Sequence, residues 1–150
     1  MPDNDPMDVP AVLKQLRAAL RLQQRSVLQY TLASGGIVGL AFQGLADRIF
    51  GYAADELRDA RLLVEKIAGL GGEPSTDVAP LRWTADADQA VDWLIESEQE
   101  TIASLHAVIP ETGEEPRSEA LEHLMEHMIL RKQSQVDFLL RALRTAGEHR

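Results

Sequence analysis

The chain has 150 residues, of which 45% are hydrophobic and 26% charged, and its formal net charge is -9. This length and balance suit one globular domain, so we expect residues 1–150 to form a single domain. The negative charge disfavours general nucleic-acid binding, which needs clustered lysine and arginine. Because the sequence contains no cysteine, disulfides, iron–sulfur clusters and thiolate zinc sites are excluded.

No segment has the pattern of a secretion signal or a membrane span. Residues 1–9 are acidic and lack the basic start and apolar run of a signal peptide, and we expect them to form a flexible tail. The most apolar stretch, from Thr31 to Phe42, is short and contains three glycines, so it is not expected to cross a bilayer. We therefore expect a cytoplasmic protein that binds neither membranes nor nucleic acid, with a frayed end at residues 146–150.

The first half of the chain has apolar residues at the spacing of two long helices, and almost nothing alternates as a strand would. The first expected helix runs from about Pro10 to Ser34. Two glycines then end or kink it, and a second helix, from about Ile37 to Leu70, begins at once. Two further glycines followed by a proline close this second helix.

The second half supplies two more helices, at about 87–109 and 118–145. A capping box between Asp86 and Gln89 opens the first of them. The loop at 73–85 is long enough to cross the length of a bundle, whereas the other connections are short. The expected fold class is therefore an all-α, antiparallel four-helix bundle with a long crossover between helices two and three.

Polar residues interrupt the apolar stripe of every helix near its middle. These residues are Gln23, Glu56, Glu98, Lys132 and Gln135. Asp59 lies one turn after Glu56 on nearly the same face. Buried charges are costly unless they are paired or bind a cation, and bundles place metals and cofactors at such central positions. The pattern predicts one polar cluster inside the bundle.

The same residues carry a resemblance to the bacterioferritin branch of the ferritin-like superfamily, which extends along nearly the whole chain. The matching positions are Gln29-Tyr30, Asp55-Glu56-Leu57 through Gly72 and Pro74, Glu98 with Leu105, and Val136-Asp137-Phe138-Leu139. The resemblance implies a ferritin-like bundle. In that family two Glu-x-x-His pairs and two further glutamates hold a di-iron centre that oxidises ferrous iron.

On the first three helices this sequence keeps only part of that ligand set. Glu56 and Glu98 match two of the family's glutamates. Asp59 stands at a histidine position and Gln23 at a glutamate position. Leu57 stands where a bacterioferritin has its haem-ligating methionine, so the resemblance implies that no haem binds.

On the fourth helix, Lys132 and Gln135 replace the family's glutamate and histidine. These losses argue against full di-iron ferroxidase activity and leave open whether the protein is an enzyme. One hypothesis is that a single Fe or Mn ion is held by Glu56, Asp59 and Glu98, an all-oxygen set that suits these ions. Lys132 would then be displaced or neutral. The other hypothesis is a metal-free dimeric scaffold or partner-binding module in which Lys132 replaces the metal.

Three further features could carry chemistry. A buried Lys132 could act as a nucleophile or base, although the sequence reveals no substrate pocket. Tyr30 would point toward Glu98 by family analogy, or simply satisfy a buried hydrogen bond. His123 and His127 have the i, i+4 spacing of a helical metal pair. Neither histidine lies squarely on the inner stripe, so a solvated surface is expected there.

Helices one and two carry a second apolar surface besides their inner stripes. It comprises Leu22, Leu32, Ile37, Val38, Leu40, Phe42 and Phe50. These side chains cannot all reach the centre of one bundle, and an exposed patch of this kind marks an interface. The resemblance implies an antiparallel dimer through the same two helices. We therefore expect a two-fold homodimer.

Overall fold

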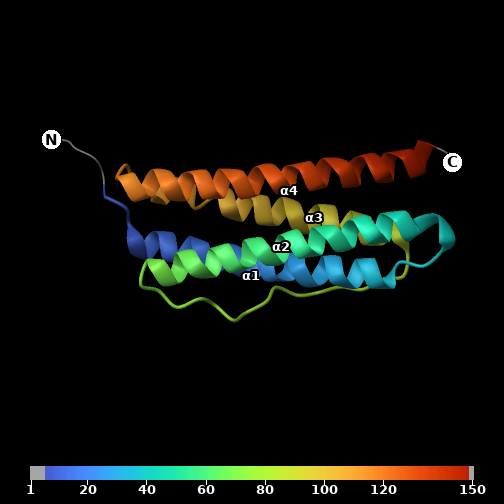
Figure 1. Ribbon diagram of the computed structural model, residues 1–150, viewed down its shortest axis with the longest axis horizontal. Helices are drawn as coiled ribbons and strands as arrows, with labels where there is room; N and C mark the ends of the chain where they lie inside the picture. Colours follow the sequence, from blue (N-terminus) through green and yellow to red (C-terminus); the bar gives the residue numbers. More distant parts are fainter. Residues whose placement is uncertain (1–5, 149–150) are drawn as a thin grey trace.

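The computed structural model describes residues 6–148, with side chains described as far as residue 143. Within that range the chain forms four α-helices and two short 3-10 helices, and no strand. They are α1 (Val9–Gly36), η1 (Leu40–Phe42), α2 (Gln43–Gly69), α3 (Ala87–His106), η2 (Ile109–Glu111) and α4 (Pro116–Glu148). The segment between α2 and α3 runs along the outside of the bundle from one end to the other (Figure 1). The expected four-helix bundle with this crossover is confirmed. None of the described helices is long and apolar enough to cross a membrane.

The residues at the start of α1 make more hydrogen bonds and are more buried than the sequence indicated. Asp8 caps the helix, because its Oδ1 accepts the backbone N–H of Ala11 at 3.2 Å. Met7 is buried, and its backbone N–H donates to Oε2 of Glu115 at 2.8 Å. The expected flexible tail at 1–9 is therefore wrong for residues 7–9, and its residues 1–5 lie outside the described part of the chain.

The connection between α1 and α2 is longer than the sequence indicated. α2 begins at Gln43 and not near Ile37, which corrects the expected boundary. The reason is the backbone after Gly36: Ile37 is extended, with a ψ of 127°, and Gly39 has a φ of 107°, in the left-handed region. The short helix η1 follows, and the amide of Phe42 donates to the carbonyl of Gly39 at 3.1 Å.

The crossover between α2 and α3 is fastened to α1. Gln29 of α1 binds the backbone of Arg82 twice, donating to its carbonyl at 2.5 Å and accepting its amide N–H at 3.1 Å. Asp86 caps α3 as expected, because its Oδ2 accepts the amide of Gln89 at 3.0 Å. α3 ends at His106, earlier than expected.

The fourth helix extends beyond both of its expected ends. α4 begins at Pro116, whose lack of an amide N–H suits the first turn, and not at Ser118. It continues to Glu148, so the frayed end expected at 146–150 overlaps this helix and otherwise lies outside the described residues.

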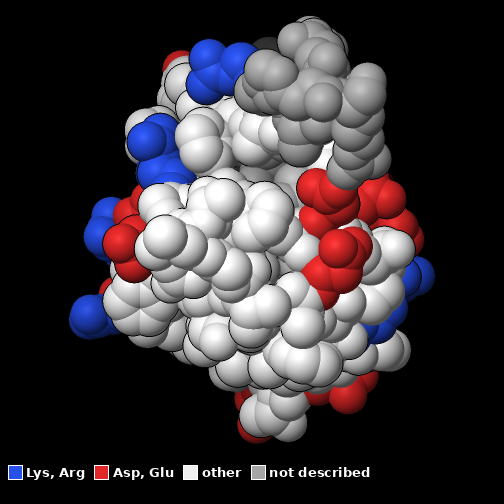
Figure 2. All heavy atoms as spheres, turned by 90° about the vertical axis from the view of Figure 1, so that its right-hand side faces the viewer, with Lys and Arg blue, Asp and Glu red and all other residues white. Residues whose placement is uncertain are grey.

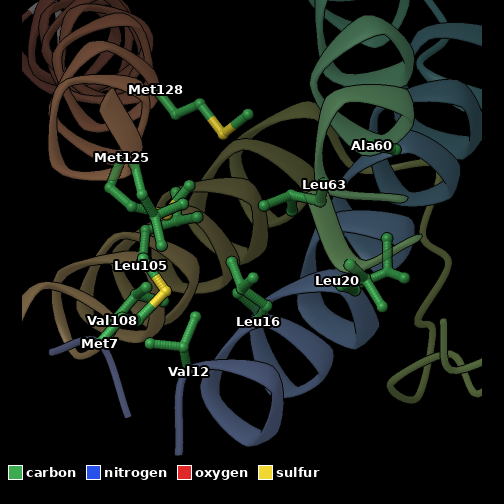
Figure 3. Packing of buried hydrophobic residues seen from close by; sticks show 13 residues of the cluster. Met7, Val12, Leu16, Leu20, Ala60, Leu63, Leu105, Val108, Met125 and Met128 are labelled. Carbon is green, nitrogen blue, oxygen red and sulfur yellow. The ribbon is translucent and has the colours of Figure 1, made fainter. Parts of the chain in front are cut away.

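The apolar core consists of two clusters, one toward each end of the bundle. One joins residues 12–20 of α1 to α2, to Leu105 and Val108, and to Met125 and Met128 of α4. Figure 3 shows the side chains of this cluster converging between the helices. The other joins Tyr30 and Ala33 of α1, and Ile37 directly after it, to α2, α3 and the later part of α4. On each helix the predicted polar residues fall between the two clusters, so they form a layer across the middle of the core.

Candidate functional site

Lys132 lies at the centre of this polar layer. Its side chain is 0% exposed, although a lysine is almost never buried unless it is paired. Its Nζ donates to Oε2 of Glu56 at 2.5 Å and to Oε1 of Glu98 at 3.1 Å. One ammonium group of α4 thus joins the carboxyl groups of α2 and α3.

Two glutamine side chains complete the bonding of Glu56. Gln23 of α1 donates from Nε2 to Oε2 of Glu56 at 2.5 Å and to its backbone carbonyl at 2.9 Å. Gln135 of α4 donates to the other carboxylate oxygen, Oε1, at 2.9 Å. Both oxygens of this buried carboxylate are therefore hydrogen-bonded, as a charge in an apolar interior requires.

Glu98 receives further contacts from α1 and α4. The hydroxyl of Ser26 donates to its Oε1 at 2.7 Å, and Nε2 of Gln135 lies 3.4 Å from its Oε2. The same amide nitrogen donates to the hydroxyl of Tyr30 at 3.2 Å. Burial, together with the negative charges of Glu98 and Glu56, raises the pKa of Tyr30 well above its ordinary value. Tyr30 is therefore a neutral, fully buried member of the cluster.

The two carboxyl groups differ in protonation. Burial raises the pKa of Glu98 to about 8, although the charge of Lys132 acts against this and that of Glu56 adds to it. Burial also acts on Glu56, but the charge and hydrogen bond of Lys132 outweigh it and hold the pKa of Glu56 below its usual value. Burial would lower the pKa of Lys132, yet the charges of Glu98 and Glu56 raise it instead. Near pH 7 the three groups are therefore an ammonium, a carboxylate and a largely protonated acid, with almost no net charge.

Asp59 pairs with a cation outside this group. Its Oδ1 accepts a hydrogen bond from Nη2 of Arg131, whose side chain is one-third exposed. Burial raises the pKa of Asp59 in spite of the charge of Arg131. Asp59, which the sequence suggested as a metal ligand beside Glu56, is thus paired with Arg131 at the edge of the polar layer.

The donor set does not fit a two-iron centre. Among the described residues, no three carboxylate or imidazole groups are placed to hold a metal ion together. The two central carboxyl groups, Glu56 and Glu98, both bind the Lys132 ammonium, whose positive charge opposes a divalent cation. One acceptor atom beside Glu56 is left over: Oε1 of the buried Gln23 has no hydrogen-bond partner among the described residues. The predicted single-ion set of Glu56, Asp59 and Glu98 would require the contacts of Lys132 with Glu56 and Glu98 to open, and the pair between Arg131 and Asp59 as well. It stays a prediction.

Some members of the layer were not expected from the sequence. Ser26 binds Glu98, and its hydroxyl lies 3.5 Å from that of Thr101. Arg25 of α1 is also buried. Its Nη2 donates to the carbonyl of Ser97 at 3.3 Å and pairs with Glu100 at 3.4 Å.

The remaining candidates lie on the surface. The side chain of His123 is largely exposed and pairs with Glu119 and Glu126 of its own helix. His127 is also exposed, as expected for a solvated face. Leu57, at the position of the family's haem ligand, is 59% exposed on α2. The expectation that no haem binds stays a prediction.

Together, the bundle and its central carboxyl groups define a class of protein, the four-helix bundles with a buried carboxylate centre. The family model described as a ferritin-like domain matches residues 13–146, and the chain belongs to this family. Comparison with curated protein sequences gives no match.

Solved structures with the same fold come from several bacteria. A ferritin-like, diiron-carboxylate protein from Bacillus anthracis str. Ames is 24% identical, with a TM-score of 0.83 over 91% of this chain and 97% of that one. The bacterioferritin of Rhodobacter capsulatus is 18% identical, with a TM-score of 0.83 over 96% and 89%. A dodecameric thioferritin from Bacteroides fragilis, a bacterioferritin-related protein, is 18% identical, with a TM-score of 0.86 over 95% and 90%. At these identities the likeness concerns the fold.

Proposed function

We propose that this chain is a ferritin-like protein in which the ammonium of Lys132 takes the place of the metal centre. It serves as a self-associating scaffold and not as an iron oxidase. The observation that carries the proposal is the bonding of the fully buried Nζ of Lys132 to both Glu56 and Glu98. A cytoplasmic location stays a prediction.

Charge supports this assignment. A divalent cation near Lys132 would meet a positive group with no high-dielectric solvent between them, where repulsion is strong. With Glu98 largely protonated, the centre already balances one ammonium against one carboxylate. Buried ions are stable only when they are paired and hydrogen-bonded in this way. Lys132 can therefore hold the helices together through the polar layer without a metal.

The outer face of α2 supports self-association. Leu57 is 59% exposed and lies at a shallow hollow of about 480 Å³, whose other lining residues are Gln24, Ala54, Arg58, Ala60, Arg61 and Val64. A projecting leucine next to an apolar hollow is self-complementary, because a two-fold axis can seat each leucine in the partner's hollow. We propose this face as the centre of the homodimer expected through helices one and two.

Metal loading tests the proposal directly. After anaerobic incubation with Fe(II) or Mn(II) and desalting, we expect substoichiometric metal by elemental analysis and no anomalous scattering between Glu56 and Glu98 in crystals. Ferrous iron should be oxidised no faster than in buffer. The matched variant Lys132→Glu with Gln135→His removes the ammonium and adds two ligands, so it should retain more metal than the wild type.

A single bound ion is the second candidate function, favoured by the unpartnered Oε1 of the buried Gln23. An amide oxygen is a ligand that hard divalent ions accept. One Fe or Mn ion per chain in the wild type, lost in the variant Glu56→Gln, would overturn the metal-free proposal and establish this candidate.

A further inference from the structure

The amine of Lys132 and the two carboxyl groups beside it are sealed from water. The exposed fraction is 0% for the side chain of Lys132 and 1% for those of Glu56 and Glu98. An apolar cluster lies on either side of this layer. Figure 2 views the end of the bundle that carries the α1–α2 connection and shows a broad uncharged surface beyond the second cluster. In water an amine and an acid form ions that do not react with each other, whereas burial disfavours both ions and so favours the neutral, reactive forms.

A nucleophile, an acid and a proton acceptor are already in contact within this layer. Nζ of Lys132 lies 3.1 Å from Oε1 of Glu98 and 2.5 Å from Oε2 of Glu56. Glu56 also accepts hydrogen bonds from the side chains of Gln23 and Gln135. These bonds keep Glu56 a carboxylate that can take a proton and leave Glu98 as the neutral acid. Groups held in contact with their reacting atoms aligned act at effective molarities of about 10⁵–10⁸ M.

We propose that Lys132 and Glu98 join in an amide bond that links α4 to α3. The bond rests on the proposed function, because a bound cation would occupy the same carboxyl groups. Nζ gives one proton to Glu56 and then attacks Cδ of Glu98 as a free amine, which forms the N–C bond. One C–O bond of Glu98 breaks, and the leaving hydroxyl takes a second proton from Nζ and departs as water. Glu56 keeps the proton that it received, so atoms and charge balance without an oxidant or a further reactant.

The surroundings of Glu98 suit this reaction. The hydroxyl of Ser26 donates to its Oε1 at 2.7 Å, and Nε2 of Gln135 lies 3.4 Å from its Oε2. Negative charge develops on a carboxyl oxygen when Nζ attacks, and donors already in place stabilise it. The product contains a neutral amide and a neutral acid, so the costly burial of an ammonium and a carboxylate ends. The reaction is slow compared with folding, so freshly folded protein still carries the ion pairs of Lys132.

The mass of the intact full chain tests the proposal. After the purified protein has been kept folded for days near neutral pH, the denatured chain should be lighter by the mass of one water. Trypsin should then release residues 132–141 joined to residues 83–117, with the linkage at Glu98. Protein kept in urea should retain its full mass, because the reaction needs the fold. An unchanged mass in the folded chain overturns the proposal, and so does a loss of water that maps to other residues.

Three variants test the roles of the side chains. Lys132→Arg keeps the positive charge in a guanidinium that does not lose its proton, so this chain should retain its full mass. Lys14→Arg, at an exposed position, should react like the wild type. Glu56→Gln removes the proton acceptor and should slow the loss of water about 100-fold or more, with circular dichroism showing that the helices are retained. Loss of water at the wild-type rate in Lys132→Arg or in Glu56→Gln overturns the proposal.

Metal analysis of the same samples separates this proposal from the proposed function. A full mass in a folded chain that also takes up no Fe or Mn overturns the amide bond alone. A full mass in a chain that binds one of these ions between Glu56 and Glu98 overturns both. A chain that is lighter by one water, linked at Glu98 and free of metal supports both.

Discussion

Lys132→Met is expected to destabilise the fold by about 3–5 kcal/mol near neutral pH. The change removes the cation that holds Glu56 ionised inside the core and leaves both carboxyl groups without their common donor. Part of the loss is relieved when the carboxyl groups take up protons, so the effect should be smaller near pH 5 than near pH 8. A thermal melt should show a midpoint roughly 10 °C lower for a chain of this length.

Two further variants separate a lost charge pair from lost packing. The double variant Lys132→Met with Glu56→Gln removes the ionised partner as well, and it should regain much of the stability lost in the single variant. Lys14→Met, at an exposed position of α1, should change stability by no more than about 0.5 kcal/mol. An unchanged or raised melting temperature in Lys132→Met would show that the ammonium is not what stabilises the carboxyl groups.

The bundle itself could be read from the sequence because its signals are local. Helical spacing of apolar residues, glycine pairs at the helix ends and the Asp86 cap each act over a few residues. The α1–α2 connection was placed wrongly for the same reason. Its apolar residues continue the pattern of a helix. The helix is broken by backbone conformation and not by hydrophobicity, because Ile37 is extended and Gly39 has a positive φ.

The central cluster was predictable only in part. Gln23, Glu56, Glu98 and Lys132 stand out because each is a polar residue on an apolar stripe. Ser26 and Thr101 lie three residues after Gln23 and Glu98, so helical spacing could have found them as neighbours of the site.

The pairing of Asp59 with Arg131 could not be found in this way. Arg131 is adjacent in sequence to Lys132 and therefore points to a different side of its helix. Only the packing of α2 against α4 brings its guanidinium to Asp59. The sequence suggested Asp59 as a third metal ligand. Asp59 pairs with Arg131 instead, whereas Glu56 and Glu98 both bind Lys132.

Glu98 is expected to make the protein less stable as pH rises from about 4.5 to about 8. Its pKa rises from a usual value of 4.5 to about 8 on folding, so within this window the folded chain binds a proton that the unfolded chain has released. The contribution of Glu98 to the free energy of unfolding is fully present below pH 4.5 and is lost as the pH rises through 8. Within this window the free energy of unfolding falls by up to roughly 1.4 kcal/mol per pH unit. Asp59, whose pKa is also raised, acts in the same direction. The lowered pKa of Glu56 has the opposite effect, because the stability that ionised Glu56 contributes is lost as the pH falls below the usual pKa of a glutamate.

Urea unfolding of the wild type and of Glu98→Gln across this window measures the slope. Glutamine copies the shape of the protonated acid and cannot ionise, so the difference in unfolding free energy between the two chains should change steadily between about pH 5 and 8. Titration of groups elsewhere cancels in that difference. Glu98→Gln should be nearly neutral at the acid end of the window and the more stable chain at the alkaline end. If the wild type instead gains stability over the variant as pH rises, then Glu98 is ionised in the folded protein. Lys132 would then hold two carboxylates, and the centre would carry a net negative charge that a cation could still compensate.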